Sequence, residues 1–296
     1  MKMNKMRADV QALLFLLPFL IVYLLFTIWP MIKGVQMTFY KWTLIKKMDY
    51  VGWSNYSKML RDQEMWDALW HSTIFVILTT PTMIVLAIVL ALIANRKSRM
   101  QKFYRSIFFL PSVLSVAVAS FLGLFVFQPY TGLVNSVLHL IGILNEHREI
   151  YWLTETNLAW IAVSLITLWW TVGFNFILYL SAMQDIPDEI YEAARLDGAN
   201  DRQTFWSITL PYLSPITKTI AMLQIIASFK VFLQIQIITG GGPLDQTRPI
   251  IQLIYQTGFK KNDLGYAATM SYMLFAILLI LSIIQYAINN RKGANT

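Results

Sequence analysis

The sequence from Glu192 to Pro211 reads EAARLDGANDRQTFWSITLP, and this polar stretch decides how the rest of the chain is interpreted. It lies between two long apolar segments, yet each of its charged side chains would be costly to place in lipid. The pattern predicts a helix, a turn and a second helix outside the membrane. Gly198 favours a left-handed end for the first helix. Asn200 favours the start of the second helix, which Pro211 is expected to end.

Composition places the chain among polytopic membrane proteins. Of its 296 residues, 56% are hydrophobic and 14% are charged, whereas about a quarter of the residues in soluble domains are charged. The sequence contains no cysteine and only three histidines, which are far apart, so no metal site is predicted. The formal charge of +8 comes from basic residues beside apolar segments, so nucleic-acid binding is not predicted either.

Six apolar segments are long enough to cross a bilayer as helices. The predicted fold is therefore all-α, a single transmembrane domain over residues 1–296. The first segment follows basic residues as a signal peptide would, but its length and the lack of a small-residue cleavage site predict an uncleaved span. The predicted spans run approximately over residues 12–32, 72–94, 107–127, 158–183, 216–239 and 266–288.

Basic residues orient these spans. The short loop Asn95–Ser106 carries five basic residues and no acidic one, which predicts that it faces the cytoplasm. An even number of spans then places both termini in the cytoplasm. Segment 185–213, between the fourth and fifth spans, is cytoplasmic in the same arrangement.

The segment between the fourth and fifth spans is acidic. Residues 185–202 include six carboxylates and two arginines. An acidic loop gains nothing from the anionic inner leaflet, which attracts positive charge. A merely solvated loop is the simpler interpretation, but it would not require the small residues Ala193 and Ala194 beside Glu192. We therefore interpret the segment as a helix that docks on a protein with a basic groove.

The spacing Glu-Ala-Ala, three residues, Gly, nine residues, Ile-x-Leu-Pro resembles the cytoplasmic signature loop of binding-protein-dependent ABC importer permeases. The run Thr239-Gly-Gly-Gly-Pro243 is similar to the T-x-G-G-P turn of the carbohydrate subfamily, which imports oligosaccharides and glycerol phosphates and includes maltose-type membrane subunits. Phe109-Leu110-Pro111 also fits this subfamily. The marked positions of the signature are all filled, by Glu192, Ala193, Ala194, Gly198, Ile208, Leu210 and Pro211.

This resemblance implies a set of partners. In that family two permease chains, usually different, form the pathway, two ATPase subunits each grip one signature loop, and a solute-binding protein delivers substrate from outside. The chain is thus expected in a bacterial or archaeal cytoplasmic membrane, as a sugar importer subunit rather than an enzyme, with no catalytic residues. ATP and Mg²⁺ are expected on the ATPase, because this chain has no G-x-x-x-x-G-K-[ST] loop. The residues expected to contact the ATPase are Glu192, Ala193, Ala194, Asp197, Gly198, Ile208, Leu210 and Pro211.

Polar residues inside the predicted spans are candidates for the substrate pathway. Lys230 lies deep in the fifth predicted span, where an unpaired charge is expensive. Gln224 and Ser228 are four residues apart on one helical face. The resemblance places the sugar site of related permeases near these residues and near Asn175 and Phe176 in the fourth span. Hydrogen bonding between helices is the alternative for the amides and the hydroxyl, and contact with the sister permease is the alternative for Lys230.

Two other functions fit a polytopic membrane protein. An ion-coupled secondary transporter of a small polar solute commonly shows inverted repeats, and we find none between residues 1–150 and 151–296. A membrane scaffold without transport leaves the acidic loop and the buried lysine unexplained. An ATP-driven sugar importer is the function that the sequence favours, although the sequence does not name the sugar.

Overall fold

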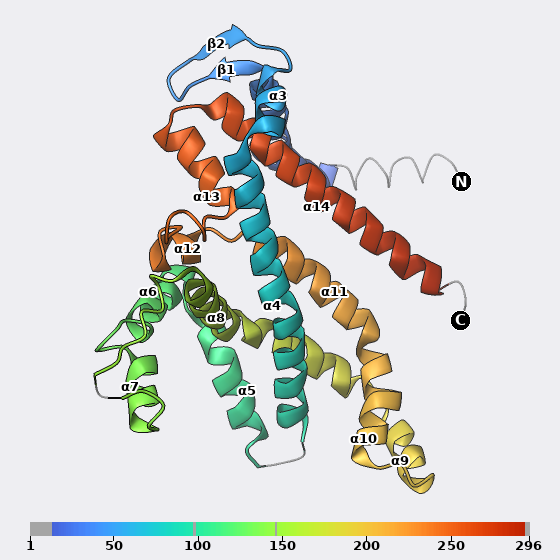
Figure 1. The fold of residues 1–296 in the computed structure, drawn as a ribbon. Helices are drawn as coiled ribbons and strands as arrows, with labels where there is room; N and C mark the ends of the chain where they lie inside the picture. Colours follow the sequence, from blue (N-terminus) through green and yellow to red (C-terminus); the bar gives the residue numbers. More distant parts are fainter. Residues whose placement is uncertain (1–13, 97–98, 146, 294–296) are drawn as a thin grey trace, which may run out of the picture. The chain divides into compact units, whose positions relative to one another are not determined.

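The computed structural model describes residues 14–96, 99–145 and 147–293 (Figure 1). The chain divides into two compact units, each described by itself below. Unit 1 comprises residues 1–63 and 254–277, and unit 2 comprises residues 64–253 and 278–296. The predicted start of the first span at residue 12 lies outside the described residues, as do both ends of the chain.

Unit 1 begins with a long apolar helix, Leu14–Thr38. Its middle is a π-helical turn, η1 (Leu24–Ile28), and α2 (Trp29–Thr38) completes it. None of the residues in its apolar window is buried within the chain. Such a surface is suited to lipid or to another membrane chain.

A two-stranded hairpin follows this helix, formed by β1 (Tyr40–Trp42) and β2 (Lys47–Tyr50). The strands are antiparallel with Tyr40 opposite Tyr50, and the centroids of these two rings are 5.2 Å apart. The prediction of an all-α fold is therefore wrong at this hairpin. Cross-strand aromatic pairs of this kind stabilise an antiparallel pair, and the apolar length that predicted the spans does not detect such a short hairpin.

The remainder of unit 1 is helical. It contains α3 (Ser54–Arg61), η4 (Gln256–Lys260) and the first part of α14 (Leu264–Gly293). The Nζ atom of Lys58 lies 3.3 Å from the carboxylate of Asp263, so residues about 200 positions apart in the sequence meet in this unit.

The described residues of unit 2 form helices joined by turns and loops. Helix α8 is central, because more than half of its apolar window is buried inside the chain. Its side chains Phe176 and Tyr179 pack in one core with Leu213 and Ile220 of α11. The elements are α4 (Gln63–Asn95), α5 (Gln101–Phe109), η2 (Leu110–Val113), α6 (Val116–Val126), α7 (Leu133–Leu140), α8 (Thr156–Gln184), α9 (Asp188–Leu196), α10 (Asp201–Thr204), η3 (Phe205–Thr209), α11 (Leu210–Phe229), α12 (Leu233–Ile238) and α13 (Ile250–Tyr255), with the last part of α14.

The third predicted span, 107–127, is not one straight helix. The axes of 101–113 and 116–126 differ by 97°. Leu114 and Ser115 are extended, and the Ser115 hydroxyl accepts from the Val118 N–H to cap α6. The carbonyl of Leu114, freed from the helix, accepts from Trp170 Nε1 at 2.9 Å. This long-range bond satisfies a partly buried carbonyl that the bend would otherwise leave without a helical partner.

The fifth predicted span, 216–239, is also interrupted. Helix α11 ends at Phe229, with Lys230 as its C-cap, and α12 starts at Leu233. Phe229 and Val231 flank the break and are both buried, with 6% and 4% of their surfaces exposed. Burial of apolar side chains on both sides offsets the loss of helical hydrogen bonds at the break.

Among the described residues, four helices are long and apolar enough to cross a membrane, and the bent pair 101–113 and 116–126 would be a fifth span. Helix α11 does not meet that test. The structure therefore shows a mostly helical membrane protein with four or five candidate spans. The four helices are Leu14–Thr38, Gln63–Asn95, Thr156–Gln184 and Leu264–Ile288.

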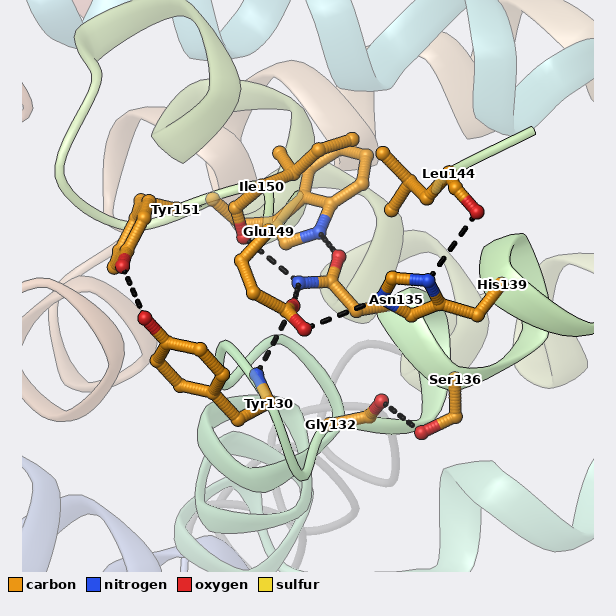
Figure 2. A network of polar contacts seen from close by, with 10 residues as sticks. Tyr130, Gly132, Asn135, Ser136, His139, Leu144, Glu149, Ile150 and Tyr151 are labelled. Atoms are coloured by element: carbon orange, nitrogen blue, oxygen red, sulfur yellow. Dashed lines mark hydrogen bonds and ion pairs between the residues drawn. The ribbon is translucent and has the colours of Figure 1, made fainter. Parts of the chain in front are cut away.

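A polar cluster fixes the connection between α6 and α8 (Figure 2). The carboxylate of Glu149 accepts from the N–H of Tyr130 at 3.1 Å, from Asn135 Nδ2 at 2.6 Å, and lies 3.1 Å from His139 Nε2. These contacts hold the pKa of Glu149 below its ordinary value, because they favour the charged carboxylate. The Tyr130 N–H has the largest effect, and Asn135 and His139 add smaller ones. Asn135 in turn accepts from Trp152 Nε1, so Glu149 and Asn135 together link Tyr130, His139 and Trp152.

Candidate functional site

The predicted coupling segment, residues 185–213, begins after α8 with the short helix α9. Asp188 and Glu189 lie in the first turn of α9 and Arg195 in its last, which complements the helix macrodipole at both ends. The helix ends in a Schellman motif, in which the Ala199 N–H bonds to the Ala194 carbonyl at 2.9 Å. Gly198 has a φ of +81°, which confirms the predicted left-handed turn.

The exposed face of α9 contains more than the signature predicted. Glu192 and Ala193 are exposed, whereas Ala194 is buried against the rest of the chain. Leu196 is 89% exposed and lies one turn after Glu192, so the two share a face. Sequence reasoning missed Leu196 because its position in the motif is not a marked one. An exposed leucine on a polar helix is nonetheless a signal of a docking surface.

The second helix of the segment starts as predicted but does not end at Pro211. Asn200 and Gln203 form a capping box before α10. The helix then continues through the π-helical turn η3 into α11, with Pro211 in the first turn of α11. A π turn accommodates the missing proline N–H, because the Leu210 N–H reaches back to the Phe205 carbonyl.

The remaining signature residues connect the coupling segment to the membrane helices. Leu210 packs against the core cluster that contains Phe176 and Ile220. Ile208, with Asp197 and Gly198, lines a shallow cavity of about 270 Å³ between the turn and η3. Tyr191 on α9 also meets Thr209, with 3.2 Å between their hydroxyl oxygens. Direct contacts thus join α9 to the residues that lead into α11.

A second candidate site is the α8–α11 cavity, a space of about 420 Å³ between η2, α8 and α11. Asn175 and Gln224, both predicted, line it together. None of its lining residues is charged. The lining residues are Ser112, Trp170, Thr171, Phe174, Asn175, Leu223, Gln224 and Ala227.

Hydrogen bonds hold the walls of the α8–α11 cavity in place. Gln224 Nε2 donates to Ser228 Oγ at 3.4 Å, and Ser228 Oγ lies 3.0 Å from Thr79 Oγ1 on α4. Ser112 Oγ donates to the Trp170 carbonyl at 2.8 Å. A Cβ at Gly173 would lie within 2.6–2.9 Å of residues 108–112, so glycine is required where α8 meets the bend.

Three of the predicted pathway residues lie outside this lining. Phe176 is completely buried and packs edge-on against Phe108. Ser228 accepts a hydrogen bond from the Gln224 side chain and does not itself line the cavity. Lys230 is exposed at the break between α11 and α12, not within a continuous helix as predicted, so its charge does not lie in the α8–α11 cavity.

The class of protein that the fold and these two sites define is a multi-pass helical membrane protein with a polar helix–turn–helix between membrane helices. The chain belongs to the family described as binding-protein-dependent transport system inner membrane component, which it matches over residues 63–293. It is therefore a non-catalytic permease subunit of an ABC importer in the bacterial inner membrane, and it works with a solute-binding protein. This membership decides against an ion-coupled secondary transporter.

Curated relatives match nearly the whole chain. The multiple sugar-binding transport system permease protein MsmF of Streptococcus mutans is 36% identical, with 94% of each chain covered. The probable ABC transporter permease protein YurN of Bacillus subtilis is 32% identical, covering 92% of this chain and 93% of the relative. The sn-glycerol-3-phosphate transport system permease protein UgpA of Agrobacterium fabrum is 31% identical, with 91% of each covered.

A solved structure shares this fold. A chain of a bacterial ABC transporter involved in the import of the acidic polysaccharide alginate superposes with a TM-score of 0.86 at 24% sequence identity. The superposition covers 97% of this chain and 98% of that one. The likeness supports the helical arrangement described above.

Proposed function

We propose that this chain is one of two permease chains of an ATP-driven sugar importer, forming half of the translocation pathway, and that the α8–α11 cavity contacts the sugar. The observation that carries the proposal is the lining of this cavity. Its amides, hydroxyls and indole are the groups that hydrogen-bond sugar hydroxyls and cover sugar ring faces, with no charge among them. Relatives named for multiple-sugar and arabinooligosaccharide transport support this substrate class.

We further propose that α9 is the coupling helix. Its exposed Glu192, Ala193 and Leu196 would dock on a partner ATPase, and Gly198 would set the turn behind them. ATP and Mg²⁺ would then be bound by two ATPase subunits and not by this chain. The second permease would be a different chain, and Lys230, exposed at its helix break, is available to contact it.

We propose six membrane crossings with both termini in the cytoplasm. The bent pair α5–α6 would be the third crossing and the interrupted pair α11–α12 the fifth. The supporting observations are the basic loop Asn95–Ser106 and the position of α9, which directly follows α8. The single permease domain would then cover residues 1–296.

Thiol labelling tests this topology, because the natural chain has no cysteine. Met100→Cys in the basic loop is expected to react with an impermeant maleimide only after cells are permeabilised. Arg148→Cys, between α7 and α8, is expected to react in intact cells. Both positions are exposed, so each is accessible on its own side. Labelling of Met100→Cys from outside would reverse the orientation.

Reconstituted transport tests the function itself. Proteoliposomes with this chain, its sister permease and its ATPase should accumulate an uncharged oligosaccharide when the solute-binding protein is outside and ATP inside. Omitting either the binding protein or ATP should abolish uptake, because this chain has no phosphate-binding loop of its own. Uptake driven by an ion gradient without ATP would contradict the proposal, as would a complete failure to move any saccharide in a broad panel.

A further inference from the structure

A cavity of about 880 Å³ lies at the end of α8 remote from the coupling segment. The first turns of α4, the start of α8 and the loop before α13 form its walls. Its volume is within the range of roughly 300–1,000 Å³ that ligand pockets occupy. We call it the indole cleft and define it by Glu64, Asp67, Trp70, Trp160, Gln246 and Arg248.

The loop that forms one wall of the indole cleft is held rigidly. Thr247 Oγ1 donates to the Gly242 carbonyl at 2.6 Å and lies 2.9 Å from Thr239 Oγ1. Leu244 and Asp245 both have left-handed backbones, with φ of 50° and 62°. Non-glycine residues persist in such conformations only where the surroundings enforce them, and they gather at binding sites. Here they present two side chains to the cleft.

Ion pairs fix the polar groups of the cleft. Arg248 Nη1 lies 3.2 Å from the carboxylate of Asp245, and its Nη2 lies 3.6 Å from that of Glu64. Asp67 lines the cleft as well, so the cleft contains three carboxylates and one guanidinium. Those four groups carry a formal charge of −2, which disfavours an anionic ligand and leaves carboxylate oxygens as acceptors for hydroxyl groups.

Two indoles give the cleft its apolar surface. Trp70 is 60% exposed on α4. Trp160 is buried beside His71, with 6.2 Å between ring centroids. Thr156 at the start of α8 donates to the side-chain oxygen of Gln246. Aromatic faces beside fixed carboxylates and amides are the combination that suits the apolar ring faces and the hydroxyl rim of a saccharide.

One face of α8 joins the cleft to the α8–α11 cavity. Asn157 lines the cleft and Asn175 lines the cavity. They are 18 residues apart, which is about five helical turns and about 27 Å on the same face. Ser164 lies on that face between them, is 6% exposed, and its hydroxyl has no hydrogen-bond partner in the described structure. Polar groups thus recur on this face of α8 between the cleft and the cavity.

We propose that the indole cleft is a second saccharide-binding site, which takes an uncharged oligosaccharide before the α8–α11 cavity and disfavours acidic ones. The proposal rests on the sugar-import function proposed above. It adds a site that precedes the cavity and a reason for substrate selection by charge. Trp70 stacks on a sugar ring, and Asp67 and Gln246 bind its hydroxyls.

Direct binding to the assembled permease–ATPase complex in nanodiscs, without the binding protein, tests the proposal. The probes are maltotriose and trigalacturonate, followed by saturation-transfer NMR. All variants carry Ala227→Trp, which fills the α8–α11 cavity and leaves the cleft as the remaining proposed site on this chain. We expect saturable maltotriose binding in this background, weakened about fivefold by Trp70→Ala through the lost stacking. Trp66→Ala, an exposed tryptophan on the same helix outside the cleft, should leave binding unchanged.

Charge selection gives an independent measurement. Asp67→Lys should raise the affinity for trigalacturonate relative to maltotriose, whereas Asp49→Lys, an exposed change in β2, should not. Absence of saturable maltotriose binding in the Ala227→Trp background would overturn the proposal. That result is the one expected if a partner protein, and not a sugar, fills the cleft. Equal losses in Trp70→Ala and Trp66→Ala would also overturn it. Sugar uptake by the natural complex is measured separately. That measurement tests the import function independently of the result for the indole cleft.

Discussion

Replacing Gly198 with valine is expected to uncouple the transporter, lowering substrate-stimulated ATP hydrolysis and uptake by roughly tenfold to a hundredfold. Gly198 has a φ of +81°, and a Cβ added there would meet nothing within 4 Å. The effect of valine is therefore conformational rather than a clash. A β-branched residue in this region costs about 1–3 kcal/mol, and the chain avoids that cost by opening the turn that fixes α9.

Two further variants separate coupling from general stability. Gly198→Asn should retain most of the activity, because asparagine tolerates the left-handed region. Gly142→Val carries the same kind of strain, with a φ of +76° and nothing within 4 Å of the added Cβ, but lies in the connection between α7 and α8. It should leave coupling intact. Normal coupled hydrolysis in Gly198→Val, or an equal defect in Gly142→Val, would show that α9 does not depend on this turn for docking.

Replacing Ala227 with tryptophan is expected to block transport, with uptake falling by roughly a hundredfold. Ala227 lines the α8–α11 cavity of about 420 Å³, and an indole there occupies the space that the sugar needs. Because the change lies at the cavity and not in the close-packed core, insertion and ATPase assembly should survive. The measurement is uptake into proteoliposomes alongside the yield of the purified complex.

Matched variants make this result specific. Thr219→Trp introduces the same side chain at an exposed position on α11 outside the cavity lining, and should transport normally. Lys230→Met should leave sugar affinity unchanged, because Lys230 is exposed at the helix break and does not line the cavity. Wild-type uptake by Ala227→Trp, or an equal loss in Thr219→Trp, would remove the α8–α11 cavity from the pathway.

The coupling segment illustrates how much of a site local sequence can predict. The turn at Gly198 and the capping box at Asn200 involve residues within five positions of each other, so their conformations follow from side-chain chemistry alone. The continuation of the helix past Pro211 was not predictable in this way. It depends on a π turn stabilised by packing of η3 and α11 against the rest of unit 2.

The α8–α11 cavity shows the opposite case. Asn175 and Gln224 were predicted as polar residues in apolar spans, but Trp170 was not among the predicted pathway residues. The structure places Trp170 in the cavity wall, where its Nε1 holds the Leu114 carbonyl at the bend. That contact joins residues 56 positions apart. The hydrophobic periodicity of the two segments does not predict this contact. A hydrophobic pattern shows which side of a helix is apolar, but not which other helix that side packs against.

By itself, the sequence determined the membrane class, most of the helices and the local geometry of the coupling segment, because apolar length, glycine turns and helix caps act between near neighbours. Tertiary structure alone decided the bend before α6, the break after α11, and the exposure of Leu196 and Lys230. It also brought Glu64, Asp245 and Arg248 together across about 180 residues of sequence. These features depend on which side chains pack or bond over long separations, and that depends on the whole fold.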